Sequence, residues 1–502
     1  MSEPLPIYPT AGIRALEAAL PAARPSLMER AGLAAAELAR ALAEDGRPIL
    51  VLAGPGNNGG DALVAARHLK AWFYRVDVVC AADPTRLPAD AAAAFAAWRA
   101  AGGAYLSEPP RRGDWGLVID GLFGIGLTRP LGEPYGTWVA QINEQAAPIL
   151  ALDIPSGLDA DSGLALGPTV RARHTVTFLA LKPGLLTADG PDHCGTLHLR
   201  TLDVPASLFP PPPGRLLETA MVRGFVRPRP RNSHKGRFGT VAVLGGAPGM
   251  TGAALLASRA ALAAGAGRVY AGLLHEAALT VDCLQPELML RSPATLPGLE
   301  PVNVIAAGPG LGTSAAALEY LRAVIGRTVP LVLDADALNL IAADPALKEA
   351  VSRRSAPTLM TPHPAEAARL LGTSVEQVQR QRVETASRLA TRFNAWVALK
   401  GVGSVCAGPT DSWFINTSGN PGLASAGTGD VLTGIVAALL AQGLGPQQAL
   451  LAGVHVHGLA ADRLVEEGIG PIGLTASELI GAVRRLLNEW AYGLSRPTDG
   501  VG

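Results

Sequence analysis

The sequence predicts an α/β protein built from two different domains. On both sides of a proline-rich segment, short apolar runs rich in β-branched residues alternate with Ala- and Leu-rich stretches of helical length, the pattern of βα units in a mostly parallel sheet. The chain has 502 residues, several times the roughly 150 of an average domain. The proline-rich segment at 209–214 reads FPPPPG, which excludes a helix and favours a stiff linker. We therefore expect domains at 1–214 and 215–502, with no sequence repeat relating them.

The strands are expected where short apolar runs precede glycine-rich or polar segments. In the first domain these runs lie at 48–52, 76–80, 117–119, 149–152 and 175–179. In the second domain they include 240–244, 268–272, 304–307, 331–333, 358–360 and 395–399. Ligands of open α/β sheets bind at the carboxyl ends of strands, so the segments after these runs are the candidates for ligand contacts.

The composition favours an enzyme of small molecules over a nucleic-acid binder. Hydrophobic residues make up 48% and charged residues 17%, which is typical of a globular chain. The 42 basic side chains balance the 42 acidic ones, whereas binding a phosphate backbone needs clustered Lys and Arg. With 58 glycines and 41 prolines, many tight loops are expected.

The cysteines and the apolar segments indicate the compartment. Four cysteines, at positions 80, 194, 283 and 406, form no CxxC pair, which argues against a zinc site and a disulfide scaffold. The first ten residues hold an acidic side chain and three prolines, unlike a secretion signal. Uncharged apolar stretches such as 431–441 are far shorter than the roughly 20 residues that span a bilayer. We expect a soluble, cytoplasmic protein without a membrane partner.

The first glycine-rich loop follows the strand at 48–52 and precedes a helix expected at 62–72. Gly54, Gly56 and Gly59 satisfy GxGxxG, and Asp77 lies about 20 residues further on, as in dinucleotide-binding folds. The same pattern arises by chance in a chain this rich in glycine, so it does not by itself establish a dehydrogenase. It also leaves the polar residues of the loop, Asn57-Asn58 and Asp61, without an explanation.

Three further strand ends, at 120–126, 153–159 and 182–184, are expected to converge with this loop on one crevice. Backbone N–H groups at 121–126 suit a phosphate, and the oxygens of Asn58, Asp120 and Ser156 suit a hard cation. Asp61 is either a site residue or a cap of the next helix, and the sequence leaves both open. For Asp153 we favour a chemical role.

These segments together resemble one family, the NAD(P)H-hydrate epimerases. The motifs are SLMERAG at 26–32, NNGGD at 57–61, DIPSGLD at 153–159, TF at 177–178 and KPG at 182–184, and the resemblance covers nearly all of 10–205. It implies a Rossmann-like αβα sandwich in which Asp153 contacts the reacting ring and is catalytic, while Asn58, Asp120 and Ser156 bind potassium. It implies that the hydrated dinucleotide is held by Asn57, Asn58, Gly59, Gly60, Asp61, Gly124, Ile125, Gly126, Leu127, Thr128, Arg129, Pro130 and Asp153.

The second domain carries its own glycine-rich loops, at 245–254, 308–312, 400–404 and 427–430. No GxxxxGK[ST] occurs, so a P-loop enzyme is unsupported. Asp430 precedes an apolar run at 431–440 that predicts a buried helix, whose N-terminal N–H groups stabilise negative charge on a transferring phosphate. A helix cap is the alternative, but we favour Asp430 as the base that takes a hydroxyl proton from the phosphate acceptor.

Lysines and strand-end polar residues support this interpretation. Of five lysines in the chain, Lys182, Lys235 and Lys400 lie within glycine-rich motifs, as expected where a compact charge is needed. His363 lies between two prolines and is either a turn residue or, as we favour, a ligand contact. Asp334 and Asp336 follow a strand, and the sequence leaves open whether they hold magnesium.

The second half resembles the ribokinase-like superfamily and, within it, the ADP-dependent NAD(P)H-hydrate dehydratases. NSHKG at 232–236, GAA at 252–254, TPHP at 361–364, KG at 400–401 and GTGD at 427–430 carry the resemblance over 225–490. It implies a second αβα sandwich that uses ADP as co-substrate together with Mg²⁺. It implies that the hydrated nucleotide meets Ala253, Gly310, His363 and Asp430, and that the adenine nucleotide meets Lys400, Gly401, Val402, Gly403, Ser404 and Gly429.

Together the two resemblances predict a bifunctional enzyme that repairs hydrated NADH and NADPH. The first domain interconverts the R and S hydrates, an isomerase activity, and the second converts the S hydrate and ADP to NAD(P)H, AMP and phosphate, a lyase activity. We expect small-molecule substrates and a homo-oligomer. The alternatives are a small-molecule kinase of the ribokinase-like superfamily, or a first domain that serves only to bind nucleotides.

Overall fold

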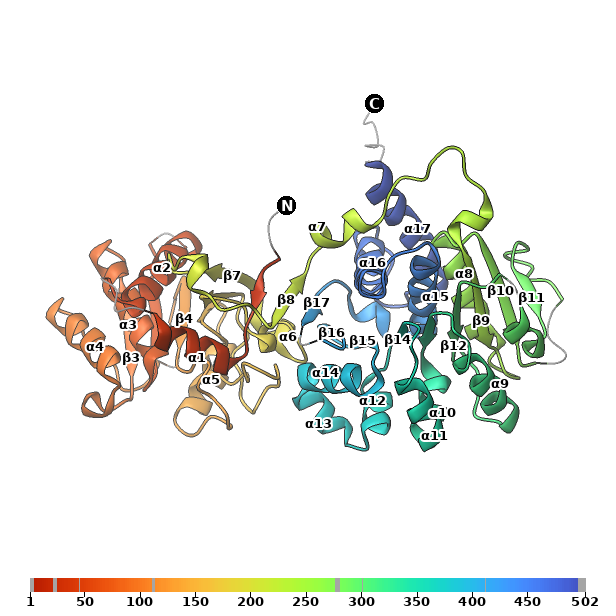
Figure 1. Cartoon of the computed structure of the whole chain (residues 1–502). Coiled ribbons are helices and arrows are strands. Elements are labelled where there is room, and N and C mark those ends of the chain that lie inside the picture. The colour runs from red at the N-terminus through yellow and green to blue at the C-terminus, as the bar shows by residue number, and fades with distance from the viewer. Residues whose placement is uncertain are drawn as a thin grey trace, which may run out of the picture. The chain divides into compact units, whose positions relative to one another are not determined.

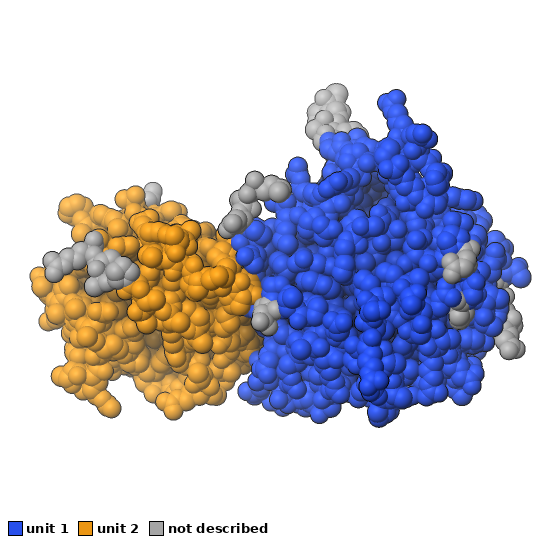
Figure 2. All heavy atoms as spheres, viewed as in Figure 1, with its two compact units in different colours: residues 1–4, 215–502 blue, residues 5–214 orange. Residues whose placement is uncertain are grey.

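The computed structural model describes residues 4–20, 25–44, 46–110, 113–275, 280–299, 301–410 and 412–494. The chain divides into two compact units, one of residues Leu5–Gly214 and one that runs from Arg215 onward (Figure 2). The prolines at 210–213, directly before the division, lie in no helix or strand. Among the helices of the described ranges, none is both long and apolar enough to cross a bilayer.

The first unit contains a parallel sheet with the strand order β3-β2-β4-β5-β6-β7. Its strands are β2 (Ile49–Ala53), β3 (Val76–Cys80), β4 (Leu117–Gly121), β5 (Ile149–Leu152), β6 (His174–Phe178) and β7 (Thr196–Arg200), and the short β1 (Pro6–Ile7) precedes them. The strand that follows β2 in the chain, β3, lies on one side of it, and the next strand, β4, lies on the other side. The carboxyl ends of β2 and β4 therefore flank the switch point at which such sheets bind ligands.

Helices cover both faces of this sheet, as the alternation along β2 requires (Figure 1). Ile49 and Val51 pack into the core under α2 and α3, whereas Leu50 and Leu52 pack into the opposite core with Trp138 of α5. The helices are α1 (Thr10–Ala19), α2 (Leu27–Leu42), α3 (Asn57–Ala71), α4 (Ala89–Ala100), α5 (Tyr135–Asn143) and α6 (Gly190–Cys194).

The second unit contains a larger mixed sheet with the order β17-β16-β15-β14-β13-β12-β9-β10-β11. The strands are β8 (Gly214–Leu217), next to β17, and β9 (Thr240–Gly245), β10 (Arg268–Leu273), β11 (Met289–Arg291), β12 (Val304–Ala307), β13 (Leu331–Leu333), β14 (Thr358–Met360), β15 (Trp396–Leu399), β16 (Ser404–Ala407) and β17 (Trp413–Asn416). From β9 to β15 the pairs are parallel, and β16 and β17 are antiparallel. The switch point here lies between β9 and β12.

Helices also cover both faces of the second sheet, with α8 and α15–α17 on one face and α9–α14 on the other (Figure 1). The first group shares one core with the apolar residues of β9, β10 and β12. The helices are α7 (Thr219–Val222), α8 (Thr251–Ala263), α9 (Ala315–Ile325), α10 (Ala335–Ala343), α11 (Pro345–Ser352), α12 (Pro364–Leu371), α13 (Val375–Arg380), α14 (Arg382–Phe393), α15 (Thr428–Ala441), α16 (Pro446–Glu466) and α17 (Ala476–Tyr492).

The predicted α/β class with largely parallel sheets is confirmed, while two helix starts and several strands differ. The first helix after β2 begins at Asn57 rather than at 62, and the helix predicted at 431–440 begins at Thr428. In both, glycines that lower helix propensity are nonetheless helical because the helix N-terminus packs against neighbouring loops. The strands β1, β7, β8, β11, β16 and β17 were not among the predicted runs; β7 and β11 are only partly buried, which weakens their hydrophobic signal.

Candidate functional sites

A cavity of about 610 Å³ opens at the switch point of the first unit, a volume that suits a small-molecule ligand. Its walls come from the ends of β2, β4, β5 and β6 and from α1, α2, α3 and α4. Of the predicted contact residues, those that line it are Asn57, Asn58, Asp61, Gly124, Ile125, Gly126, Leu127 and Asp153. Lys182 of the motif at 182–184 lines it too, so the structure brings four separate strand-end motifs into one cavity.

The remaining predicted residues lie outside the cavity walls. Gly59 packs so tightly on the β2 loop that an added Cβ would lie 2.0 Å from the carbonyl oxygen of Gly54. Gly60 packs against the thioether of Met28, 2.6 Å from an added Cβ. These two glycines permit close packing of α3, and Thr128, Arg129 and Pro130 are not among the lining residues.

An ion pair between Asp153 and Lys182 lies in this cavity. The Lys182 ammonium is buried and donates to Asp153 Oδ1 at 2.5 Å, to Thr177 Oγ1 at 2.8 Å and to the carbonyl oxygen of Phe178 at 2.9 Å. With three acceptors, the lysine has its full set of hydrogen bonds. Asp153 has φ of 63°, a left-handed conformation that is uncommon outside glycine. The carboxylate is the more exposed partner, at 14% against 1% for the lysine.

Asn58, Asp120 and Ser156 belong to three elements that meet beside the cavity. Ser156 donates from its Oγ to Asp120 Oδ1 at 2.7 Å and from its backbone N–H to Oδ2 at 2.8 Å. Burial raises the pKa of Asp120 to about 6, although these hydrogen bonds oppose the shift. Asn58 donates to the carbonyl oxygen of Leu152 at 3.2 Å, and its buried Oδ1 has no hydrogen-bond donor within the described ranges. A buried acceptor without a donor beside a buried carboxylate fits a bound cation.

Sequence reasoning missed three charged residues of the cavity, Arg14 and Glu17 on α1 and Asp90 on α4. Burial, followed by the charges of Asp153 and Glu17, raises the pKa of Asp61 well above its usual range. Asp61 is not the helix cap considered above, because the cap of α3 is Gly56. The only signal in the sequence was the i, i+3 spacing of Arg14 and Glu17, which puts both on one face of a helix.

The second unit holds a comparable ion pair at the ends of β13 and β15. Lys400 donates to Asp334 Oδ1 at 2.7 Å, and Thr433 Oγ1 of α15 donates to Asp334 Oδ2 at 2.8 Å. Here the aspartate is the buried partner, at 2% exposure against 23% for the lysine. Burial by itself lowers the pKa of Lys400, but the surrounding carboxylates, Asp334 first, outweigh it and raise that pKa.

Asp430 lies in the first turn of α15, next to this pair. The cap residue of α15 is Gly427, with φ of 88°, and Asp430 is the third residue of the helix. A Cβ on the neighbouring Gly429 would lie 3.3 Å from Lys400 Nζ, so the lysine reaches the start of this helix. Burial, then the charge of Asp334, raises the pKa of Asp430 to about 7, and Lys400 opposes the shift. The capping role considered above is therefore absent.

His363 caps α12. The ring Nδ1 accepts from the backbone N–H of Ala365 at 3.1 Å, and the backbone N–H of His363 donates to Glu366 Oε2 at 2.7 Å. Burial, followed by the charge of Lys400, lowers the pKa of His363, so the ring is neutral at pH 7. Burial raises the pKa of Glu366 to about 7. The sequence did not single out this residue.

Further predicted residues of the second unit lie at the β9/β12 switch point, after the end of β13 and in a 3₁₀ turn. Gly310 and Ala253 are neighbours at the β9/β12 switch point, where a Cβ on Gly310 would lie 3.1 Å from that of Ala253. Asp336 accepts from the N–H of Gly312 at 2.8 Å, and Asp334 has both oxygens engaged as described. Lys235 is exposed in a short 3₁₀ turn.

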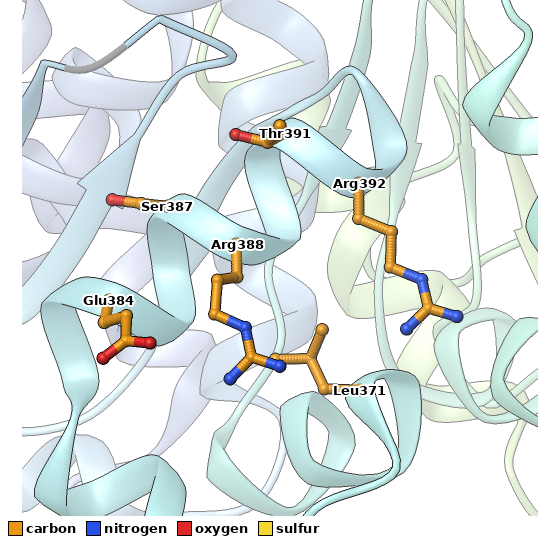
Figure 3. Close-up of a pocket in the computed structure, with 6 residues that line it drawn as sticks. All are labelled: Leu371, Glu384, Ser387, Arg388, Thr391 and Arg392. Atoms are coloured by element: carbon orange, nitrogen blue, oxygen red, sulfur yellow. The ribbon is translucent and has the colours of Figure 1, made fainter.

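A further cavity of about 390 Å³ is an open groove between α12 and α14 (Figure 3). It is lined by Leu371, Glu384, Ser387, Arg388, Thr391 and Arg392. No predicted site residue is among them. The groove is therefore separate from the strand-end sites.

Comparison with known proteins matches both units. A family model described as "NAD(P)H-hydrate dehydratase" matches residues 241–485, and one described as "YjeF-related protein N-terminus" matches residues 24–184. The chain is 39% identical over 469 residues to the bifunctional NAD(P)H-hydrate repair enzyme Nnr of Coxiella burnetii, covering 92% of this chain and 94% of that protein. It is also 39% identical to the Nnr enzyme of Escherichia coli, covering 92% of this chain and 89% of that one.

Among solved structures, the chain is similar to the ADP/ATP-dependent NAD(P)H-hydrate dehydratase of Bacillus subtilis, co-crystallised with ATP and Mg²⁺. That similarity has 30% identity and a TM-score of 0.48, and it covers 55% of this chain and 98% of that one.

The two sheets and their strand-end sites define an α/β enzyme with two separate active units. The chain belongs to the family of bifunctional NAD(P)H-hydrate repair enzymes. This confirms the two resemblances drawn from the motifs and the isomerase and lyase activities that they imply.

Proposed function

We propose that the first unit interconverts the R and S hydrates of NADH and NADPH, and that the second dehydrates the S hydrate with ADP. The observation that carries this proposal is the pair of strand-end Asp–Lys contacts, because they present opposite charges. In the first unit the carboxylate of Asp153 is the more exposed partner, and in the second it is the ammonium of Lys400. A carboxylate suits proton chemistry at a ring, and an ammonium suits a nucleotide phosphate.

In the first unit, the dinucleotide is proposed to lie along the start of α3 and the 124–127 loop, with its hydrated ring at Asp153. The helix N-terminus at Asn57 favours the negative diphosphate. Lys182 orients Asp153 and balances its charge. Asp61, whose pKa burial raises well above its usual range, is a further acidic group in the cavity.

Potassium is proposed to bind through Asn58, Asp120 and Ser156. The Asn58 Oδ1 without a donor and the buried Asp120 carboxylate support this donor set. The ion would supply positive charge that balances Asp120 and holds the three strand ends together.

In the second unit, Asp430 is proposed to take the proton of the ring hydroxyl, so that the oxygen attacks the terminal phosphorus of ADP and AMP leaves. The phosphate ester then loses phosphate and a ring proton, which restores the dihydropyridine. A pKa of about 7 suits a general base at neutral pH. Lys400 and the α15 N-terminus bind the charged phosphates. The residues from 400 to 404 with Gly429 are proposed to bind ADP, and Ala253, Gly310 and His363 the hydrate.

Magnesium is proposed to accompany the nucleotide rather than to bind Asp334. Both oxygens of Asp334 are engaged, by Lys400 and Thr433, and Asp336 accepts from a backbone N–H. A hard divalent cation needs open oxygen ligands, which this pair does not provide. A magnesium ion held by these aspartates is therefore not part of the proposed mechanism.

The cellular setting is proposed to be the cytoplasm, with the enzyme acting as a homo-oligomer on small molecules. Cys80, Cys194 and Cys406 are buried free thiols and Cys283 is an exposed one, which supports a reducing compartment. Light scattering of the purified protein measures the oligomeric state.

One experiment tests both halves of the proposal. The enzyme is given a mixture of R and S hydrates with ADP and Mg²⁺, and the recovery of reduced nicotinamide absorbance is followed together with AMP release. Complete recovery with one AMP per NAD(P)H is expected. Recovery that stops at the S fraction contradicts the epimerase assignment, and a stable phosphorylated product without recovery indicates a kinase instead.

A further inference from the structure

Arg382, the first residue of α14, makes a dense set of contacts with the loop that follows β15. Its side chain is 3% exposed. Nη2 donates to the carbonyl oxygens of Lys400 at 3.2 Å, Leu399 at 3.3 Å and Gly403 at 3.5 Å. Nη1 donates to Gln379 Oε1 at 2.7 Å. One guanidinium thus contacts both ends of the 400–403 loop.

The charge of this guanidinium has no anionic acceptor. Within the described ranges its terminal nitrogens donate to carbonyl and amide oxygens, and its Nε has no acceptor at all. Burial lowers the pKa of Arg382 to about 10, so the group remains cationic at neutral pH. Burying a charge without a compensating opposite charge is costly. Here the positive charge of Arg382 stays uncompensated directly behind the 400–403 loop.

Gly401 shows how closely the loop fits the guanidinium. Its φ of 135° suits glycine, and an added Cβ would lie 2.9 Å from Arg382 Nη2. Because the C=O and N–H of a trans peptide point in opposite directions, the Lys400 carbonyl on Arg382 turns the Gly401 N–H away from Arg382. The arginine therefore fixes the orientation of the loop's peptide groups.

We propose that Arg382 is a positioning residue for the nucleotide: it fixes the 400–403 loop and adds positive charge behind it, so that the loop binds the anionic ADP. This rests on the proposed role of the loop in binding ADP. Arg382 acts through the loop and touches neither the reacting hydroxyl nor Asp430.

The test compares Arg382→Gln with Arg388→Gln. Arg388 lies on the same helix, but it is exposed and extends into the groove of Figure 3. Arg382→Gln should raise the KM for ADP about tenfold or more and leave kcat within about twofold, because hydrogen bonds from charged donors contribute more than neutral ones. Arg388→Gln should change neither constant. A residue needed only for folding would lower kcat through the loss of active enzyme and leave KM unchanged, and that result overturns the proposal.

Gly401→Ala gives an independent test that does not depend on the folding of Arg382→Gln. The added methyl group would push against the guanidinium, so the KM for ADP should rise in the parent; an unchanged KM contradicts the proposal. Where Arg382→Gln folds, the two effects on the KM for ADP should be less than additive, because the contact with the guanidinium is then lost and only the strain at φ of 135° remains; fully additive effects contradict the proposal. Lys400→Ala separates the two levels of inference: if it leaves the KM for ADP unchanged, the loop does not bind ADP and the proposed function fails. If it raises that KM and Arg382→Gln does not, only the role of Arg382 fails.

Discussion

The two units use the same pair of side chains at a strand end, with the burial reversed. In the first unit Lys182 is buried among three acceptors, and Asp153 is turned toward the cavity. In the second unit Asp334 is buried between Lys400 and Thr433, and Lys400 is turned toward Gly429 and the start of α15. Both pairs are neutral overall, yet the first offers a carboxylate to a ligand and the second offers an ammonium.

This difference shows that residue type alone does not define such a site. A buried partner whose hydrogen bonds are complete acts as a fixed support, and its exposed counterpart is free to meet the ligand. The second unit also contains carboxyl groups outside the pair, Asp430 and Glu366, whose pKa values burial raises to about 7. It therefore combines a partly exposed lysine with two separate buried carboxyl groups of raised pKa.

The largest expected effect is that of Asp430→Asn, which removes the proposed base but keeps the size of the side chain. Dehydration should fall by roughly 10²- to 10⁴-fold, the usual contribution of a positioned base, while ADP binding and epimerisation persist. The S hydrate should then accumulate, as followed by chromatography of the hydrates. Dehydration within about threefold of the parent would mean that Asp430 is not the base.

The pH dependence of the parent enzyme provides a companion measurement. The base must be deprotonated, so dehydration should increase as pH rises through about 7. Since the folded pKa is raised above that of the unfolded chain, the folded state binds the proton more tightly, and the unfolding free energy falls as pH rises from about 4 to about 7. In Asp430→Asn, the contribution of Asp430 to the pH dependence of dehydration and to that of the unfolding free energy should both be absent.

Lys182→Met tests the buried partner in the first unit. It leaves the Asp153 carboxylate without its cation, and breaking a buried pair typically costs about 3–5 kcal/mol. Epimerisation should be lost, and the first unit should unfold at lower denaturant, while S hydrate is still dehydrated.

Lys400→Ala tests the exposed partner in the second unit, where the lysine contacts the proposed nucleotide site. The KM for ADP should rise, epimerisation should be unchanged, and the loss of stability should be smaller than for Lys182→Met, because Lys400 is partly exposed. A normal ADP response would mean that this lysine is structural, and a larger loss of stability here than in the first unit would reverse the comparison drawn above.

Asp120→Ala should have a narrower effect, restricted to the first unit. Removing the buried carboxylate takes away one proposed potassium ligand and the two hydrogen bonds from Ser156. Hydrate binding should weaken, and any potassium dependence of epimerisation should disappear, as measured in potassium and in tetramethylammonium buffers. An unchanged response to potassium would exclude this site.

The smallest effect is expected from separating the units. Each unit holds both members of its own ion pair, so polypeptides 1–214 and 215–502 should each fold and retain one activity. Circular dichroism and the two assays provide the measurement. If neither fragment is soluble, the boundary at the proline run is wrong.

Much of the site was predictable because its residues follow buried strands directly. The strand at 76–80 was predicted with the bounds that β3 shows, and the motifs after β2, β4 and β5 meet in one cavity as expected. Glu17, Asp90 and Arg382 were not predicted, since each comes from a helix whose own sequence gives no sign of what it faces. The helix start at Asn57 was missed because glycines in the first turn weaken the helical signal.

The sequence by itself determined the α/β class, most of the parallel strands and the strand-end motifs, since hydrophobic periodicity and glycine-rich turns are local properties of the chain. The tertiary structure decided which member of each Asp–Lys pair is the more exposed, which carboxyl groups have a raised pKa and which arginine contacts the 400–403 loop. These properties depend on burial and on partners distant in the chain. Asp334 and Lys400 are 66 residues apart in sequence, and only the folded sheet brings them within hydrogen-bond distance.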